Sequence, residues 1–490
     1  MVRLSSLAGL AISALAFLGA TKPVEPRGNK GPLHDEDTYI GVINATPYRW
    51  TRGYNNFYQV LGWFWPEHID PGESFQLLAE RRNGFFADDS AAEVDFHLEG
   101  TSKPMSFQVQ YRKGYPHRVW VAFKEELETM NNRKGTQHEL GFLRMPGGVG
   151  FMLAGTEGHF ISNDPPITWM QDTLPDVGHI PLRELALPRS HHAGMWKGVA
   201  PIGAGCPGNT LTQDDDLYNQ LGNGGIRILD VRATKWHKHF RESHASKVKG
   251  LGWQGMFGAG VHEMIDIVNR FTEQYPGELI VFDMHEEARN ADDHFDKLDE
   301  SETAELYELL QLLNHRISVP DDEDITKWPL ERFIGNGTTA VLVHIKKSWL
   351  PLGSFPGGKE GFVSDNNFPF WGRWSNKNNV DEMVADQLEQ LRSHQTHRAS
   401  KVWNMEWTVT QHAGNIVWPV DSIMKMNWPA WRSLYHEFWD ALTDEMYPNW
   451  LTMDKVHHNQ QKAMVMAINH CLAARKCGSL GGKVNTTAAA

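Results

Sequence analysis

The chain has 490 residues, a formal net charge of −13, and a composition of 41% hydrophobic and 22% charged residues, which is typical of a soluble globular protein long enough for two domains. The negative charge disfavours a nucleic-acid-binding protein, because phosphate backbones are bound by basic surfaces. It also disfavours tight electrostatic docking on anionic membranes, so we expect any contact with a membrane surface to be transient.

The first twenty residues have the pattern of a secretory signal peptide. Arg3 supplies a basic start, Leu7–Leu18 form an apolar stretch, and Gly19 and Ala20 offer a small-residue cleavage point. The apolar stretch is too short to span a bilayer. We therefore predict a signal peptide over residues 1–20 and a secreted, extracellular protein, with a buried N-terminal helix as the alternative.

The chain is not a disulfide-dense scaffold, because it contains only three cysteines. Cys471 and Cys477 could close a small loop near the C-terminus, which would leave Cys206 free. Three sequons for N-linked glycans fit a secreted protein. They begin at Asn44, Asn336 and Asn485.

Short strands and turns dominate the chain after the signal peptide. Residues 21–37 are rich in Pro, Gly and charge, which predicts a linker. The segment Glu93–Leu98 alternates apolar and polar side chains, as a strand with one solvent-facing side does. Many short strands at near-regular spacing predict an all-β sandwich over residues 38–165. The other predicted strands are Tyr39–Asn44, Phe57–Leu61, Phe75–Glu80, Ser106–Tyr111 and Val119–Phe123.

From residue 166 onward, strand-like and helical runs alternate. The alternation predicts an α/β domain with parallel strands, and its size favours a (β/α)8 barrel of the TIM type over residues 166–477, with a flexible tail over residues 478–490. Active sites of such barrels lie at the C-terminal ends of the strands. The predicted strands are Ile226–Arg232, Glu278–Met284, Ala340–Ile345, Val402–Thr408 and Trp450–Asp454. The predicted helices are His262–Tyr275, Thr303–Leu313, Val380–His394, Ala430–Tyr447 and Asn459–Cys471.

Three clusters of polar residues follow strand-like runs in this second part. In the first cluster, a short apolar run ends at Pro188, and Ser190, His191 and His192 follow before Gly194. A histidine on a loop just past a strand is poorly placed for core packing. The alternative to a catalytic role, for either histidine taken by itself, is that it is a surface or hydrogen-bonding residue.

The second cluster lies in the predicted strand Ile226–Arg232. Asp230 and Arg232 point to the same side of that strand, because strand side chains alternate. The two residues form either a structural ion pair or, beside a histidine, a cradle for an anion, which a guanidinium matches well.

The third cluster follows the apolar strand Leu279–Phe282. Asp283, His285 and Glu287 share a face if the strand continues that far. The alternative is that the acidic residues begin a helix, where they favour the helix dipole.

Taken together, these clusters resemble the X-type catalytic domain of phosphatidylinositol-specific phospholipases C. Leu187–Met195 resembles the motif of the first catalytic histidine, Leu229–Arg232 the second-strand motif, and His244 with Gly252–Gly255 the position of the second catalytic histidine. The resemblance spans about residues 170 to 475. The β-rich N-terminal part resembles the extra module of some fungal secreted relatives. Further matching segments are Val268–Phe271, Pro276–Val281 and Tyr447–Asp454.

The resemblance implies a two-histidine phosphodiesterase that needs no cofactor. His191 would be the general base that takes the proton of a substrate hydroxyl, which attacks phosphorus to give a cyclic phosphate, and His244 the general acid that protonates the leaving oxygen. Arg232 would stabilise charge on the phosphoryl oxygens. Asp230 would orient Arg232 or a histidine, and Asp454 would be a partner for His191. The substrate would be a phosphodiester lipid or glycolipid of the phosphatidylinositol class.

Five further residues are expected to contact the substrate. His285 and Glu287 fall where the family places pocket and support residues, and Trp374 and Trp407 are candidates to line a sugar or lipid pocket. His192 stands where most relatives have an aspartate directly after the first histidine. If that aspartate tunes the acid or the arginine, His192 weakens catalysis or shifts its pH optimum.

The expected independence of metal ions rests on Arg232. Calcium-dependent members of the family carry a carboxylate at this position, whereas a guanidinium repels a cation. One alternative is a zinc site at His237 and His239, which share a face. Two others are a metal-dependent enzyme of the glycerophosphodiesterase or sphingomyelinase-D kind, and a glycan- or lipid-binding protein with an inactive barrel.

Overall fold

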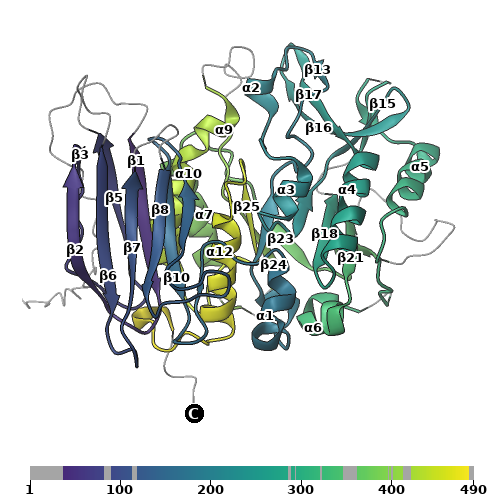
Figure 1. The fold of residues 1–490 in the computed structure, drawn as a ribbon. Coiled ribbons are helices and arrows are strands. Elements are labelled where there is room, and N and C mark those ends of the chain that lie inside the picture. The colour runs from purple at the N-terminus through teal and green to yellow at the C-terminus, as the bar shows by residue number, and fades with distance from the viewer. Residues whose placement is uncertain are drawn as a thin grey trace, which may run out of the picture.

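The structure is a computed structural model that describes residues 37–81, 90–112, 118–284, 288–292, 294–320, 323–345, 361–395, 397–398, 401–411 and 421–484. Two facing β-sheets form the N-terminal part, and a mixed α/β assembly forms the rest (Figure 1). The predicted signal peptide, residues 21–36 of the predicted linker and residues 485–490 of the predicted tail lie outside the described residues.

The two N-terminal sheets enclose an aromatic core. The Trp50 and Phe107 rings lie 4.8 Å apart between centroids, and Phe107 lies 4.7 Å from Phe151 of the opposite sheet. Burial alternates along the strand that contains Glu93–Leu98, as predicted. The first sheet runs in the order β11 (Ile161–Ser162), β10 (Gly148–Ala154), β1 (Thr38–Ala45), β5 (Ser74–Arg81), β3 (Val60–Leu61). The second runs in the order β4 (His68–Ile69), β2 (Trp50–Tyr58), β6 (Ala91–Leu98), β7 (Met105–Arg112), β8 (Arg118–Glu125), β9 (Gln137–Gly141).

One predicted glycosylation site is buried in this part of the fold. The Asn44 side chain is inaccessible to solvent, and its amide nitrogen donates hydrogen bonds to the carbonyl oxygens of Tyr48 and Ile69 at 2.8 and 2.9 Å. The prediction of a glycan at Asn44 is therefore wrong, because the nitrogen that would be modified lies inside the fold. Asn336 is exposed, and Asn485 lies outside the described residues.

The α/β part is organised around a curled parallel sheet. Its strands follow the order that a barrel requires, since the last strand, β25, pairs with the first, β12. The described residues do not form the predicted closed barrel. The strands at the two ends of the sheet, β22 and β23, do not pair with each other, although they are neighbours in the chain with only residues 365–369 between them. The sheet order is β22 (Phe362–Ser364), β21 (Ala340–Ile345), β18 (Leu279–Met284), β14 (Ile228–Asp230), β12 (Leu187–Ser190), β25 (Trp450–Met453), β24 (Val402–Glu406), β23 (Phe370–Gly372).

A second sheet lies at the top of the α/β part in Figure 1. Its main feature is the long antiparallel pair of β16 and β17, which the sequence patterns do not predict. This pair brings the segment around His244 back to the parallel strands. The sheet order is β13 (Ala200–Ile202), β17 (Gly252–Gly260), β16 (His239–Val248), β15 (Ala233–Trp236), β19 (Arg289–Asn290), β20 (Asp296–Lys297).

Helices follow most of the parallel strands, close to the predicted positions. The α-helices are α1 (Trp169–Val177), α2 (Pro207–Thr210), α3 (Leu217–Leu221), α4 (Val261–Gln274), α5 (Glu300–Leu310), α6 (Leu330–Ile334), α7 (Val380–His394), α9 (Ile423–Met426), α10 (Trp428–Ser433), α11 (Trp439–Ala441) and α12 (Gln460–Ala467). The 3-10 helices are η1 (Leu182–Glu184), η2 (Ile325–Lys327), η3 (Gly335–Gly337) and η7 (Gly481–Lys483), and the π-helices are η5 (Leu434–Phe438) and η6 (Ile468–Ala473). No helix in the described ranges has the length and apolar character needed to cross a membrane.

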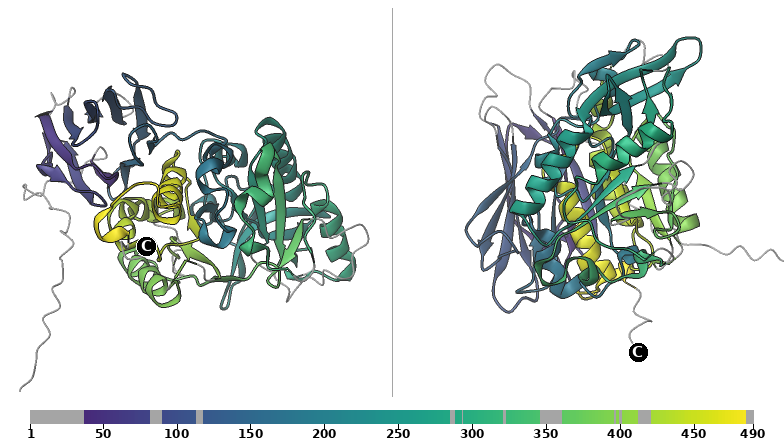
Figure 2. Two further views of the ribbon diagram at one scale, coloured as in Figure 1. Left: turned by 90° about the horizontal axis from the view of Figure 1, so that it is seen from below. Right: turned by 90° about the vertical axis from the view of Figure 1, so that its right-hand side faces the viewer.

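The C-terminal helices join the two parts of the molecule. Seen from below, they lie between the N-terminal sheets and the α/β part (Figure 2, left). The Tyr435 side chain packs closely on β1 and β10: a β-carbon at Gly41 would lie 2.5 Å from its Cβ, and a β-carbon at Gly150 would lie 2.2 Å from its ring. One continuous apolar cluster extends from the N-terminal sheets through these helices to the parallel sheet. Cys471 and Cys477, which the sequence allows to close a small loop, form a disulfide, and the third cysteine is free.

Candidate active site

Side chains from several strand ends surround one pocket of about 160 Å³. It lies where β12, β14, β24 and β25 end and where β16 passes them. The residues that line it are His191, Asn209, Thr210, Arg232, His244, Ala245, Ser246, Gln254, Trp374, Glu406, Val409, Thr410, Gln411 and Ile423. His191, Arg232 and His244, which are far apart in the sequence, therefore share one pocket.

His191 follows directly after β12 and is held by a carboxylate. Its Nδ1 lies 2.7 Å from Oδ1 of Asp454, which follows β25. The other oxygen of Asp454 accepts a hydrogen bond of 2.7 Å from the side-chain amide of Asn427. Burial raises the pKa of Asp454, and the positive charges of His191 and Arg232 oppose this rise. With Nδ1 engaged, His191 has its Nε2 left for the substrate.

His244 comes from β16 and is held by a neutral group. Its Nδ1 lies 2.7 Å from the carbonyl oxygen of Thr210 at the end of α2. A carbonyl only accepts hydrogen bonds, so Nδ1 carries the hydrogen and Nε2 is the free ring nitrogen. Burial, followed by the charge of His191, lowers the pKa of His244 to about 3. The His191 and His244 ring centroids are 6.0 Å apart.

Arg232 stands beside the two histidines and is anchored by Asp230. Nη2 of Arg232 lies 3.2 Å from Oδ2 of Asp230, and Nε donates to Oδ1 at 3.4 Å. Asp230 is fully buried, and its Oδ2 also accepts a hydrogen bond from the backbone nitrogen of His192 at 3.0 Å. The same carboxylate thus fixes the guanidinium and the loop that carries His191.

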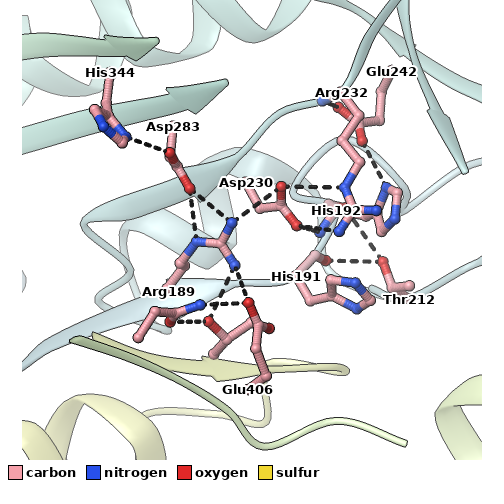
Figure 3. Close-up of polar contacts among 12 residues, drawn as sticks. Arg189, His191, His192, Thr212, Asp230, Arg232, Glu242, Asp283, His344 and Glu406 are labelled. Carbon is pink, nitrogen blue, oxygen red and sulfur yellow. Dashed lines mark hydrogen bonds and ion pairs between the residues drawn. The ribbon is translucent and has the colours of Figure 1, made fainter. Parts of the chain in front are cut away.

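A buried arginine that the sequence analysis does not single out lies behind this pair. Nη2 of Arg189 lies 2.8 Å from Oδ2 of Asp283 and 3.2 Å from Oδ1 of Asp230 (Figure 3). Its Nη1 donates to Thr452 at 3.1 Å and lies 3.6 Å from the carboxylate of Glu406. The guanidinium therefore ties its own strand, β12, to residues from four other strands. A charged residue directly after a short apolar run, two positions before a histidine, is the signal that could have revealed it.

The network continues to His344 on β21. Its Nδ1 lies 2.8 Å from Oδ1 of Asp283, and its Nε2 lies 3.3 Å from Asp365. Burial alone would lower the pKa of His344, but the two carboxylates outweigh burial and raise it. Burial also raises the pKa of Glu406 at the pocket wall, although the charge of Arg189 opposes the rise.

The two predicted tryptophans occupy different environments. Trp374 lines the pocket and is 50% exposed. Trp407 is fully buried, and its indole nitrogen donates to the carbonyl of Ala430 at 3.0 Å and to the hydroxyl of Ser433 at 3.1 Å. The prediction that Trp407 contacts the substrate is therefore wrong, because this side chain belongs to the core.

His192 is likewise buried and does not line the pocket. Its Nδ1 lies 2.9 Å from Oε1 of Glu242, and its ring stacks on His244 with centroids 4.1 Å apart. The expectation of direct substrate contact is not met, since His192 lies behind His244. His285 and Glu287 lie outside the described residues.

The zinc alternative finds no supporting geometry. His237 lies in the turn between β15 and β16, whereas His239 is the first residue of β16. Nδ1 of His237 lies 3.9 Å from Asp292. In the described part of the chain, no group of three or more His, Cys, Asp or Glu side chains is arranged to hold a metal ion.

The sequence matches no protein-family model and no curated protein. Solved structures to which the chain is similar include phosphatidylinositol-specific phospholipases C from Staphylococcus aureus. One single-site mutant has 15% sequence identity and a TM-score of 0.44 and covers 62% of this chain and 98% of its own. A second structure, from work on the modulation of membrane binding by the Staphylococcus aureus enzyme, has 16% sequence identity and a TM-score of 0.42. It covers 62% of this chain and 98% of its own. These bacterial enzymes are distant structural neighbours of this chain.

Proposed function

We propose that this protein is a phosphoric diester hydrolase of the phosphatidylinositol phospholipase C type that works without a metal ion. The observation that supports this most strongly is the opposed pair of His191 and His244. Each ring is held at Nδ1, by Asp454 and by the carbonyl of Thr210, and each has Nε2 left for the same pocket. Two imidazoles in these positions suit the transfer of one proton from, and one proton to, a substrate.

The proposed reaction begins with a hydroxyl group next to the phosphodiester on the substrate. His191 takes the proton of this hydroxyl, and its oxygen attacks phosphorus to form a new P–O bond. The bond from phosphorus to the leaving oxygen breaks, and His244 gives that oxygen a proton. The products are a cyclic phosphate and an alcohol. The cyclic phosphate opens when water attacks phosphorus and the two histidines exchange roles.

Arg232 would stabilise the negative charge that builds up on the phosphoryl oxygens in this step. Asp230 holds the guanidinium by two contacts, so it enters the reaction already oriented. The positive charge of Arg232 at the pocket also disfavours a metal ion there, which is why we propose a metal-independent mechanism.

The lowered pKa of His244 fits the role of acid once substrate is bound. In the free site, burial keeps His244 neutral at ordinary pH. An anionic phosphodiester next to the ring favours the charged imidazolium and raises this pKa. His244 would therefore take up a proton together with the substrate and release it readily to the leaving oxygen.

The proposed substrate is a lipid whose head group carries several hydroxyls, such as phosphatidylinositol or a glycosylated relative. Amide side chains of Asn209, Gln254 and Gln411 line the pocket beside Trp374, and amides and an aromatic face suit a polyol. We further propose that the protein is secreted and meets this substrate transiently at a membrane surface.

The test is hydrolysis of phosphatidylinositol vesicles in excess chelator, followed by phosphorus NMR. The proposal expects the signal of a cyclic inositol phosphate from the wild-type protein and none from His191→Ala. Turnover that requires an added divalent metal would contradict the metal-free mechanism. It would favour a metal-dependent phosphodiesterase instead.

A further inference from the structure

Glu242 is a buried carboxylate next to the site for which the proposed reaction has no use. It lies on β16, two residues before His244, and its side chain is inaccessible to solvent. The pairing of β16 with β17 shifts register between Arg241 and Ser243. Such a bulge breaks the alternation of a strand and redirects a side chain. Glu242 and Ser243 are accordingly both buried. The Glu242 carboxylate is hydrogen-bonded to His192 and Arg232, which follow β12 and β14.

Two glycines pack against the stem of the Glu242 side chain. A β-carbon at Gly194 would lie 2.6 Å from Cβ of Glu242 and 2.8 Å from its Cγ. A β-carbon at Gly258, on the neighbouring strand, would lie 3.4 Å from the same Cβ. The carboxylate is therefore fixed by close packing along its stem as well as by its hydrogen bonds.

The two carboxylate oxygens of Glu242 reach two different residues, His192 behind the pocket and Arg232 at its wall. Oε1 lies 2.9 Å from Nδ1 of His192, and Oε2 accepts a hydrogen bond of 2.9 Å from the backbone nitrogen of Arg232. Figure 3 shows Glu242 beside Arg232 with its carboxylate directed at the His192 ring. The His192 ring in turn stacks on His244, with centroids 4.1 Å apart and an angle of 29° between the planes.

We propose that Glu242 is a positioning residue that sets the acid histidine and the phosphate-binding arginine relative to each other. It acts on His244 through the stacked ring of His192, and on Arg232 through the backbone. This inference rests on the proposed function. In this arrangement Glu242 holds the His192 ring, and the His192 ring holds His244 by stacking on it.

The expected effect is on turnover more than on binding. The pocket walls that hold a head group do not include Glu242 or His192. A displaced His244 ring would reach the leaving oxygen poorly, and a misplacement of about 1 Å can cost about 10²-fold in rate. We therefore expect loss of Glu242 to lower kcat by about 10²-fold, with KM changed by less than about threefold.

Glu242→Gln is the sharpest variant, because it keeps the size of the side chain. A carboxylate accepts at both oxygens, whereas an amide offers one accepting oxygen and one donating nitrogen. Glutamine therefore cannot accept from both His192 and Arg232. Glu263→Gln is the matched control, since Glu263 lies on α4 and forms an exposed ion pair with Lys197.

Gly194→Ala is an independent variant that leaves every polar group in place. Its added methyl group would press on the stem of Glu242, so we expect the same fall in kcat with an unchanged KM. A wild-type kcat in Gly194→Ala and Glu242→Gln, each checked for folding by thermal denaturation, would overturn the proposal. The proposal would also be overturned if the loss of activity in each variant were no larger than its loss of folded protein.

NMR of nitrogen-labelled histidine tests the inference separately from catalysis. We expect Glu242→Gln to shift the ring signals of both His192 and His244, and Glu263→Gln to leave them unchanged. Signals of His244 that do not move in Glu242→Gln would overturn the positioning role. If they move while the wild-type protein cleaves no phosphodiester, the positioning holds and the proposed function alone fails.

Discussion

His191 and His244 face each other across one pocket with ring centroids 6.0 Å apart, and they are held by groups of different charge. Asp454, a carboxylate, holds Nδ1 of His191, whereas a neutral carbonyl holds Nδ1 of His244. A carboxylate stabilises the imidazolium that forms when a histidine takes a proton. A half-buried ring held by a neutral carbonyl has no such stabilisation and gives its proton up readily. The asymmetry therefore favours His191 as the base and His244 as the acid.

The first prediction concerns Asp454→Asn. Both oxygens of Asp454 accept, one from His191 and one from Asn427, and an amide cannot accept at both positions. The His191 ring would lose its orientation and the charge that favours proton uptake. We expect kcat to fall by at least about 10²-fold, measured as initial rates with thermal denaturation as the folding control. A folded variant with nearly wild-type kcat would contradict the role of Asp454.

The second prediction concerns stability and Arg189. Arg189→Met would leave the carboxylates of Asp230, Asp283 and Glu406 without their buried guanidinium. Removing one partner of a buried charge network costs about 3–5 kcal/mol, which urea unfolding would measure. The control is Lys425→Met, which breaks an exposed ion pair and is expected to cost less than about 1 kcal/mol. Equal effects of the two variants would contradict the structural role of Arg189.

The third prediction is a pH dependence that comes from His244. Its pKa of about 3 lies below the ordinary 6.5, so between these values the unfolded chain binds a proton that the folded protein does not. The stability linked to this group is present above pH 6.5 and is lost as pH falls towards 3. Relative to His244→Gln, wild-type stability should therefore decline as pH is lowered. A pH-independent difference in the free energy of unfolding would contradict this.

The fourth prediction separates the two tryptophans. Trp374→Ala removes an exposed ring at the pocket, so we expect KM to rise about three- to tenfold with kcat and stability nearly unchanged. Trp407→Ala removes a fully buried ring and is expected to destabilise the fold by about 3–5 kcal/mol. Steady-state kinetics and urea unfolding of both variants check this. A KM effect from Trp407→Ala in a stable protein would reverse the assignment.

Periodicity predicted the regular elements of the α/β part well. The strand Ala340–Ile345 and the helix Val380–His394 have the predicted bounds, because the strand is rich in β-branched residues and the helix repeats apolar residues at helical spacing. The pairing of β16 with β17 was not predicted, since charged residues and glycines interrupt any alternation there. The open side of the parallel sheet was not predicted either, because pairing between β22 and β23 depends on tertiary geometry.

The sequence located the residues of the candidate site better than it located their supports. His191, Arg232 and His244 were predicted from short motifs, and they share one pocket. Arg189 and Glu242 were missed, because a buried charge is recognised only when its partners from distant strands are known. Trp407 was misplaced for a related reason, since no local pattern distinguishes a tryptophan in a core from one at a pocket.

The most direct test of the acid and base assignments uses two inositol phosphodiesters, one with the natural leaving oxygen and one with sulfur in its place. A thiolate leaves without a proton, so the sulfur substrate does not need the acid. The account predicts that His244→Ala is at least about 10²-fold impaired on the oxygen substrate but nearly wild-type on the sulfur substrate, whereas His191→Ala is impaired on both. Equal impairment of His244→Ala on both substrates, or recovery of His191→Ala on sulfur, would contradict the two-histidine mechanism.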